Sequence, residues 1–375
     1  MQKTKVAIYG LTTEGYTLAT KMVEKASVTI VDDTLQMAMD LNAQMVKTNR
    51  SLGQLLGEES LMGLKPISQV LSEAKVVLFA PKLRKTGDES IIESSGKMRE
   101  VAKQLSKGGT VINILPVGIG GNGDNIALIE KQTGLKVGES LNYGYCPFRP
   151  GGSPGPVAYF AKMKDYVAAE DIGLHSSEDD ITASELEHAS GVLNEGASIA
   201  TEIELMKKAR GKRIGPSGAV AERFIDDLAS RVYDLTAIQS SEDVGEPLTY
   251  LAGAALKSLE NHLRYVVEET REVLRVLQLK ASKTRVIVAW TIDKYEMRAD
   301  RLKTAEKLEE KLRDYVTDVR HAQASVGREE VMDPYKHNVA IACSAGDLEW
   351  VRRLKGGTHS AELSILKATP ALSRA

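Results

Sequence analysis

The first part of the chain alternates short apolar runs with amphipathic stretches, which is the pattern of a parallel sheet flanked by helices. Val6 to Tyr9 is a short apolar run of the kind that forms a strand buried on both faces. A glycine turn follows, and then a segment, 17–25, whose apolar residues recur at helical spacing. The next apolar run, 28–31, ends in acidic residues at 32 and 33. The pattern predicts a βαβ unit, the usual seat of a dinucleotide.

Two further apolar runs continue this pattern. Segments 75–80 and 110–115 read as strands, and each is closed by a proline, Pro81 and Pro116. A helical pattern lies between them, and another is expected for the apolar residues from 35 to 45. The prediction is an α/β fold with a Rossmann-like doubly wound parallel sheet. Residues that follow its strands would lie at the carboxyl edge, where such sheets bind ligands.

A second glycine-rich junction lies between a predicted strand and a predicted helix. The stretch from Gly118 to Asn125 contains four glycines and precedes a helix expected over 126–133. Its backbone amides could hold an anion. Equally, glycines are common in turns that bind nothing. The role of the Gly118 to Gly123 loop stays open at this point.

The pattern changes to long helices from residue 184 onward. Apolar residues recur every three or four positions over 184–209, and with alternating spacings of three and four over 255–277. A further long helix is expected over 297–324. We therefore predict a Rossmann-like domain at 1–180 and a mainly α-helical domain at 181–375. The long helices either pair within one chain or intertwine with a second copy, and we favour a homodimer through the C-terminal helices.

Composition and charge narrow the class of protein. The 375 residues carry 49 basic and 51 acidic side chains, a net charge of -2, which argues against nucleic acid or an anionic membrane as a partner. Cys146 and Cys343 have neither disulfide-framework nor metal-site spacing. No apolar segment is long enough to cross a membrane, and no signal peptide is expected. The predicted compartment is the cytoplasm, and the expected partner is a small-molecule ligand.

The first glycine turn carries the candidate cofactor site. The dinucleotide fingerprint has glycine at its first, third and sixth places, which here are Gly10, Thr12 and Gly15. Pyrophosphate would lie at the helix N-terminus, and Asp32 would bind the ribose and favour NAD over NADP. The alternative is a Rossmann turn that no longer binds a cofactor, because Thr12 replaces the glycine that lets pyrophosphate approach closely.

The order of these pieces resembles the UDP-glucose/GDP-mannose (nucleotide-sugar) dehydrogenases, a family in the 6-phosphogluconate-dehydrogenase-like Rossmann group. The resemblance covers roughly residues 1–205 and rests on Gly10-Leu11 with Gly15-Tyr16, Val77 to Pro81, Leu115 to Gly118, Tyr145-Cys146-Pro147 with Arg149, and Ala183 to Leu186. It implies an NAD or NADP site at Gly10, Leu11, Thr12, Gly15, Asp32, Pro81 and Pro116, and substrate contacts at Tyr145 and Arg149.

The chain also departs from that family. The catalytic cysteine of a Cys-x-Pro-Lys-Asp segment is missing, the loop glutamate falls at Phe148, and the central-helix lysine falls at His188. His188 is then the candidate proton carrier, or simply an exposed helix histidine. A fainter similarity to Hmd-type hydrogenase paralogues lacks the iron-binding cysteine near Asn113 to Pro116. We expect an NAD(P)-dependent oxidoreductase-like protein that acts on an unidentified small molecule. The alternative is a non-catalytic nucleotide-binding sensor or scaffold.

Overall fold

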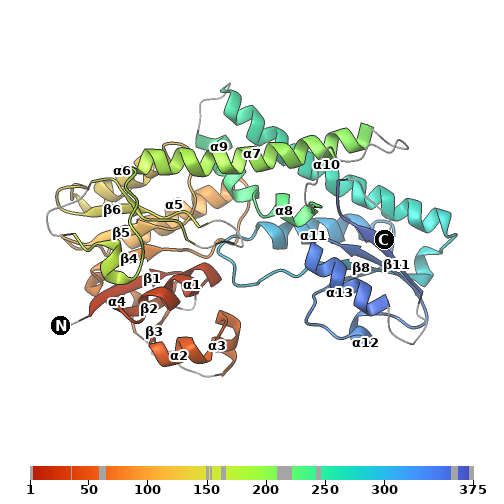
Figure 1. The fold of residues 1–375 in the computed structure, drawn as a ribbon, viewed down its shortest axis with the longest axis horizontal. Helices are drawn as coiled ribbons and strands as arrows, with labels where there is room; N and C mark the ends of the chain where they lie inside the picture. The colour runs from red at the N-terminus through yellow and green to blue at the C-terminus, as the bar shows by residue number, and fades with distance from the viewer. Residues whose placement is uncertain are drawn as a thin grey trace. The chain divides into compact units, whose positions relative to one another are not determined.

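The computed structural model describes residues 3–34, 36–58, 65–148, 152, 154–161, 166–208, 222–241, 246–355 and 362–370. The chain forms two compact units (Figure 1). Unit 1 comprises Met1–Gly191, Thr236–Glu246 and Tyr295–Ala299, and unit 2 comprises Val192–Leu235, Pro247–Lys294 and Asp300–Ala375. The division falls inside a helix at residue 191, rather than at the predicted residue 180, and two later segments return to unit 1.

Unit 1 is built on a seven-stranded sheet in the order β3-β2-β1-β4-β5-β6-β7. Its strands are β1 (Thr4–Tyr9), β2 (Ala26–Asp32), β3 (Met37–Leu41), β4 (Val76–Phe79), β5 (Thr110–Asn113), β6 (Asn142–Tyr145) and β7 (Ala158–Tyr159). The five inner strands are parallel, whereas the edge strands β3 and β7 are antiparallel to their neighbours. The predicted parallel strands are confirmed.

The helices of unit 1 are α1 (Thr13–Met22), α2 (Ala43–Thr48), α3 (Leu52–Glu58), α4 (Ile67–Glu73), α5 (Asp88–Ala102) and α6 (Gly121–Thr133), with a 3-10 helix at Ala169–Ile172. From β1 the chain crosses through α1 to β2 on one side, and from β4 it crosses through α5 and α6 toward β6 on the other. Because parallel crossovers are right-handed, α1 and α5 cover opposite faces of the sheet. The doubly wound arrangement predicted from the sequence is therefore present.

The prediction of a helix over residues 35–45 is wrong. Met37–Leu41 is the edge strand β3, and α2 begins only at Ala43. Strand β3 pairs with β2 along its whole length, from Met37 opposite Asp32 to Leu41 opposite Val28, and Asp40 is its one exposed residue. Position 35 lies outside the described residues.

Unit 2 contains a four-stranded parallel sheet in the order β11-β10-β8-β9. Its strands are β8 (Thr284–Ala289), β9 (Asp318–Ala322), β10 (His337–Ala342) and β11 (Leu363–Lys367), and its helices include α8 (Ile225–Ala229), α10 (Pro247–Val276), α11 (Asp300–Arg313), α12 (Arg328–Val331) and α13 (Ala345–Lys355). A 3-10 helix, Ala281–Lys283, leads into β8. Two helices, α7 (Ile181–Lys208) and α9 (Val232–Ser241), belong partly to each unit.

The predicted C-terminal helices are present as α7, with 28 residues, and α10, with 30. The sheet within this region was not predicted. The single helix expected over 297–324 is wrong, because α11 ends at Arg313 and strand β9 follows. One hydrophobic cluster on this sheet contains Phe224, Trp350 and apolar residues from each of the four strands, among them Ile287, Ala322, Ala340 and Ile365.

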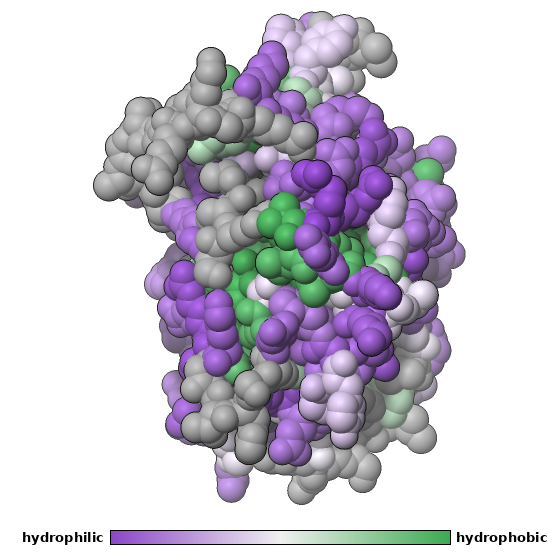
Figure 2. All heavy atoms as spheres, turned by 90° about the vertical axis from the view of Figure 1, so that its right-hand side faces the viewer, coloured by the Kyte–Doolittle hydropathy of each residue, from purple (hydrophilic) through white to green (hydrophobic). Residues whose placement is uncertain are grey.

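The heptad seam of α10 is covered within the chain. Its residues Leu259, Leu263, Val266 and Val273 are buried. Figure 2, which looks at the molecule from the right-hand side of Figure 1, shows an apolar patch bordered by hydrophilic side chains on that face. Among the described residues, no helix is both long and apolar enough to span a membrane.

Candidate functional site

The glycine turn after β1 is held tightly against the end of β4. Gly10 has a φ of 125°, a conformation that side chains disfavour, and its amide donates to the carbonyl of Val31 over 2.9 Å. A Cβ atom at Gly10 would lie 1.9 Å from the carbonyl oxygen of Ala80. The packing of the strands therefore requires this glycine, whether or not a cofactor binds.

Thr12 caps the helix that follows. Its backbone is extended, and its hydroxyl accepts a hydrogen bond from the amide of Gly15 over 3.0 Å. The same hydroxyl donates to the carbonyl of Ala80 over 3.3 Å, so the Thr12 side chain is completely buried. The neighbouring residue of the predicted site, Leu11, is also buried. The departure from the glycine fingerprint is thus a side-chain N-cap that uses one of the first amides of α1.

A segment from later in the chain covers the same helix end. We call residues Tyr295–Met297 the strap; they belong to unit 1. The carbonyl of Tyr295 accepts from the amide of Thr13 over 2.9 Å, and the amide of Met297 donates to the carboxylate of Glu14 over 2.9 Å. The first contact uses an amide at the helix N-terminus, where pyrophosphate lies in a dinucleotide-binding βαβ unit.

The acidic end of β2 carries charges of both signs. The carboxylate of Asp32 accepts from the amide of Thr34 over 2.7 Å, and Asp33 forms an ion pair with Lys97 of α5. Arg84, which follows β4, donates from its guanidinium to the Thr34 hydroxyl over 2.7 Å. The position expected to bind ribose hydroxyls therefore has cations beside its carboxylates.

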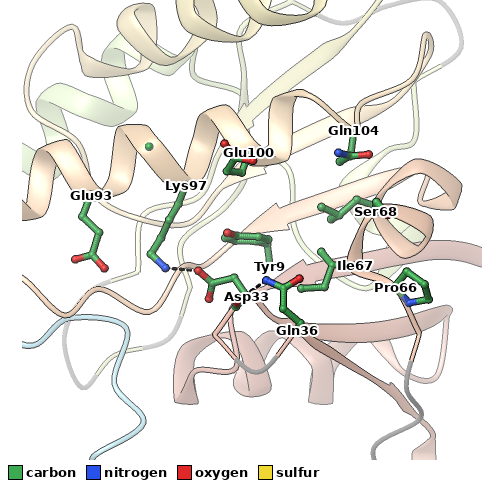
Figure 3. A pocket seen from close by; sticks show the side chains of 12 residues that line it. Tyr9, Asp33, Gln36, Pro66, Ile67, Ser68, Glu93, Lys97, Glu100 and Gln104 are labelled. Carbon is green, nitrogen blue, oxygen red and sulfur yellow. Dashed lines mark hydrogen bonds and ion pairs between the residues drawn. The ribbon is translucent and has the colours of Figure 1, made fainter.

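A cavity of about 580 Å³ opens beside Asp33. Figure 3 shows Lys97 and Gln36 reaching toward Asp33, with the ring of Tyr9 beside them. Tyr9 stacks on Phe79, with ring centroids 5.8 Å apart. Burial and the neighbouring Asp33 carboxylate raise the pKa of the Tyr9 phenol, so the phenol stays protonated. The rest of the lining comes from α4 and α5 and their flanks, namely Pro66, Ile67, Ser68, Leu71, Glu93, Gly96, Glu100 and Gln104.

The second glycine-rich junction holds an anion from the chain itself. The carboxylate of Glu185, near the start of α7, accepts from the amides of Gly120 over 3.0 Å and Asn122 over 2.8 Å. Glu185 is 4% exposed, and burial raises the pKa of its carboxyl even though these two amides act in the opposite direction. A Cβ atom at Gly118 would lie 2.2 Å from the carbonyl oxygen of Ala237 in α9. The loop is thus a filled packing site.

The other predicted residues of the sheet edge are buried. Pro81 and Pro116 follow β4 and β5 as expected. Tyr145 is fully buried, and its hydroxyl accepts from the amide of Val117 over 3.4 Å. Its substrate contact stays a prediction. The other predicted substrate residue, Arg149, lies outside the described residues.

His188 lies in α7 and is 3% exposed, so the alternative of an exposed helix histidine is wrong. It lines a separate cavity of about 350 Å³ together with Ser184 and Glu187 of the same helix and the proline-rich loop of Pro147, Pro154 and Pro156. The structure therefore brings His188 to the loop that was predicted to bind substrate. Its role as a proton carrier stays a prediction.

Neither cysteine of the chain has the properties of a nucleophile. The Cys146 thiol is buried and donates to the carbonyl of Gly155, and burial raises its pKa to about 12. Cys343 is also buried, which raises its pKa. Both thiols stay protonated near neutral pH, whereas covalent catalysis needs a thiolate.

Sequence reasoning missed three groups that shape these sites: Glu14, Glu185 and the strap. Glu14 could have been found, because an acidic residue in the first turn of a helix competes with a bound phosphate for the same amides. Glu185 and the strap could not, because nothing local in the sequence shows that either one reaches a distant helix end.

The comparisons with known proteins show which fold this is. No family model and no curated protein sequence matches the chain. Among solved structures, it resembles a UDP-D-ManNAc dehydrogenase from Pyrococcus horikoshii, with a TM-score of 0.62, 16% identity and coverage of 89% of this chain and 88% of the other. A UDP-glucose dehydrogenase from Pyrobaculum islandicum gives a TM-score of 0.62 and 13% identity, covering 98% and 94%.

A third match is the UDP-N-acetyl-mannosamine dehydrogenase of S. aureus, with a TM-score of 0.57, 13% identity and coverage of 99% and 96%. These identities are low enough that the likeness concerns the fold alone. The similarity to Hmd-type paralogues stays a prediction. The resemblance predicted from the sequence is confirmed at that level: this chain has the fold of the nucleotide-sugar dehydrogenases.

Proposed function

We propose that this protein binds a nicotinamide dinucleotide, NAD or NADP, in unit 1 and acts as an oxidoreductase on an unidentified small molecule. The observation that carries the proposal is the cavity where Asp33, at the end of β2, meets Tyr9 at the end of β1. In an open α/β sheet, the adenosine half of a dinucleotide binds beside the end of the second strand. A volume of about 580 Å³ is in the range of small-molecule sites.

The lining of this cavity suits an adenosine group. The Tyr9 ring and Ile67 offer apolar surface for a base, while Gln36, Ser68 and Gln104 offer polar groups for its edges. Asp33 would accept hydrogen bonds from ribose hydroxyls once Lys97 adjusts. The same cleft thus provides both an apolar and a polar half.

Arg84 bears on the choice between the two cofactors. Its guanidinium lies on the Thr34 hydroxyl, just beyond the end of β2. A guanidinium at this place can bind a 2'-phosphate, which the carboxylates of Asp32 and Asp33 alone would repel. NADP therefore deserves the same test as NAD, although the sequence favoured NAD.

The buried thiols support a reaction without a covalent intermediate. When bound, the nicotinamide would accept or supply a hydride. The protein would then have to hold the substrate, exclude water and move one proton, for which His188 is the proposed carrier. The cavity at His188 would be the place for the substrate, and the buried position of the ring there would keep water from it.

The cavity can be tested by filling it. Gly96 lines the cavity, and a Cβ atom there meets nothing within 4 Å, so Gly96→Leu would enter the space without a backbone clash. We expect this variant to weaken the binding of adenosine, NADH and NADPH by about tenfold or more in calorimetry. The matched control is Gly57→Leu in α3, which also meets nothing within 4 Å and lies outside the cavity.

The competing function is a non-catalytic sensor or scaffold. It is supported by the occupied end of α1 and by the two buried thiols. If the wild-type protein binds none of the three ligands, the scaffold function replaces our proposal. If it binds them, a substrate-dependent change in nicotinamide absorbance would mark it as an enzyme.

We also propose that the protein forms a homodimer through its C-terminal helices. The support is the set of exposed apolar residues near the start of α10, Leu248, Tyr250 and Leu251, because the central seam is already covered. Sedimentation equilibrium would decide: a single monomeric species at micromolar concentration contradicts this proposal. The cytoplasm stays the predicted compartment.

A further inference from the structure

We propose that the strap, Tyr295–Met297, is an autoinhibitory element that occupies the pyrophosphate seat of α1 and must leave before a dinucleotide binds. The inference rests on the proposed function, since it concerns the same ligand. It differs from that function in what it predicts, because adenosine lacks a pyrophosphate and does not need the strap to move.

Three amides at the start of α1, those of Thr13, Gly15 and Tyr16, already donate hydrogen bonds within the protein. A helix begins with backbone N–H groups that have no partner within the helix, and these are the groups that bind phosphate. Here Thr13 donates to the carbonyl of Tyr295, and Gly15 donates to the hydroxyl of Thr12. Tyr16 donates to the carbonyl of Thr12 over 2.8 Å, as in a regular helix. A pyrophosphate would have to displace Tyr295 to reach the amide of Thr13.

The negative charge of Glu14 also disfavours pyrophosphate at the start of α1. The Glu14 carboxylate is 7% exposed, lies in the first turn of α1 and accepts from the amide of Met297. A pyrophosphate would bring negative charge close to this carboxylate, which is unfavourable in a partly buried site. The carbonyl of Tyr295 is neutral, so the strap satisfies the same helix end without that repulsion.

Further contacts hold the strap in place. The carbonyl of Met297 accepts from the amide of Leu83 over 2.7 Å, and the Met297 side chain is fully buried. The ammonium of Lys82 lies 5.4 Å from the centre of the Tyr295 ring. Leu83 and Lys82 belong to the loop after β4, which forms the other side of a dinucleotide cleft. The strap therefore joins both sides of that cleft.

The contact with α1 is nevertheless weak enough to be exchanged. Bonds from amides to a charged phosphate are roughly twice as strong as the neutral bond that Tyr295 makes. Lys294, which precedes the strap, and Asp300, three residues after its end, belong to unit 2. The strap is thus a short segment held by a few hydrogen bonds and the burial of Met297. The apparent affinity for a dinucleotide equals the affinity of the open state multiplied by the fraction of molecules whose strap is open.

The test compares NADH with adenosine in variants that loosen the strap. Tyr295→Gly removes the tyrosine ring from the strap and leaves α1 unchanged. Glu14→Gln removes the charge of the carboxylate that accepts from the amide of Met297. We expect each variant to bind NADH about tenfold more tightly than the wild type and to bind adenosine equally well. Tyr335→Gly, at an exposed tyrosine of unit 2, is the matched control and should change neither affinity. Thermal unfolding verifies that each variant is folded.

Hydrogen exchange provides a second readout on the wild-type protein. When NADH is added, the amide of Met297 should exchange faster because it loses Glu14, while the amide of Thr13 should stay protected because phosphate replaces Tyr295. The inference is overturned if NADH and adenosine both bind, the variants do not change the NADH affinity, and Met297 stays protected. If no protein of the set binds adenosine or NADH, the proposed function fails and the inference fails with it.

Discussion

Unit 1 contains two helix N-termini that each follow a parallel strand and a glycine-containing turn, and the chain caps them in different ways. At α6 the amides of Gly120 and Asn122 meet the carboxylate of Glu185. At α1 the amides of Thr13 and Gly15 meet a carbonyl and a hydroxyl. One end is therefore capped by a carboxylate of the protein, and at the other end the amides meet only neutral acceptors.

This difference assigns the two ends different roles. Glu185 belongs to a helix of 28 residues, so its carboxylate cannot leave without moving a large element. The Tyr295 carbonyl belongs to a short strap between regular elements. A ligand anion can replace a neutral carbonyl, whereas it would have to compete with a buried charge at α6. The proposed ligand is therefore placed at the α1 end.

The largest effect is expected from the glycines of the two turns. Gly10→Ala would place a Cβ atom 1.9 Å from the Ala80 carbonyl oxygen at a φ of 125°. We expect it to lower the free energy of unfolding by about 4 kcal/mol, through overpacking and backbone strain together. Gly120→Ala, at a φ of 78° with nothing within 4 Å, should cost only about 1 kcal/mol. Urea unfolding measures both, and equal losses would show that the close approach at Gly10 is not required.

The next effect concerns the cap of α6. Glu185→Ala would leave the amide of Gly120 and the buried amide of Asn122 without their acceptor and should cost about 3 kcal/mol. Glu185→Gln keeps one acceptor oxygen and should cost about 1 kcal/mol. If the α6 end is an anion site, phosphate should restore part of the stability of Glu185→Ala and leave the wild type unchanged. A loss below about 0.5 kcal/mol in the alanine variant would mean that Glu185 is not a structural cap.

The Glu185 cap predicts that the free energy of unfolding depends on pH. The buried His262 of unit 2 has a larger effect of its own, which is measured first. Burial in α10 lowers the pKa of His262 to about 4 from an ordinary value of 6.5, with smaller influences from the Ala368 carbonyl, Lys207 and Glu204. Between these two pH values, His262 is protonated in the unfolded chain and neutral in the folded chain. Stability should therefore fall by about 2 kcal/mol from pH 7 to pH 5, and His262→Asn should abolish that loss. Urea unfolding at the two pH values measures it.

In the His262→Asn background, Glu185 should act in the opposite direction. Its pKa is raised in the folded chain, so the folded chain takes up a proton at a higher pH than the unfolded chain does. Stability should rise as the pH falls through the folded pKa, and Glu185→Gln should remove this rise. The acceptors of the Thr13 and Gly15 amides at α1 are the neutral Tyr295 carbonyl and Thr12 hydroxyl, so neither contributes to this slope. Identical slopes in all these variants would contradict the assignment of a charge to α6.

The sequence predicted the fold best where the signal is local. The strands β1, β4 and β5 are short apolar runs, and the helix after each one has its own apolar spacing, so each could be recognised alone. β9 was read as part of a helix, because Arg320 and His321 make this edge strand partly polar and its buried positions are few. A polar edge strand and an exposed helix surface have the same composition, and only pairing with β8 distinguishes them.

The place of the candidate site in the fold could be predicted from the sequence, but the protein groups that occupy it could not. The carboxyl edge, the turn at Gly10 and the departure at Thr12 follow from strand order and fingerprint. The occupants of the helix ends, Glu185 and Tyr295, come from distant parts of the chain, and their positions depend on tertiary packing. The fold resemblance therefore indicated where a ligand would bind, but it gave no information on whether the amides at the start of α1 were already hydrogen-bonded.

The smallest effect should come from restoring the fingerprint itself. Thr12→Gly removes the hydroxyl that accepts from Gly15 and the buried contact with Ala80, at a cost of about 1 kcal/mol in the free energy of unfolding. The variant frees the Gly15 amide and opens the space into which pyrophosphate comes in the usual fingerprint. We therefore expect NADH to bind about fivefold more tightly, although the fold is less stable. Adding Tyr295→Gly should increase the affinity further, because it loosens the strap that covers the amide of Thr13, whereas Thr12→Gly frees the amide of Gly15. Calorimetry on the two single variants and the double variant measures whether the gains combine. If Thr12→Gly lowers stability without any gain in NADH affinity, the threonine is only a helix cap, and the strap alone decides whether a dinucleotide reaches α1.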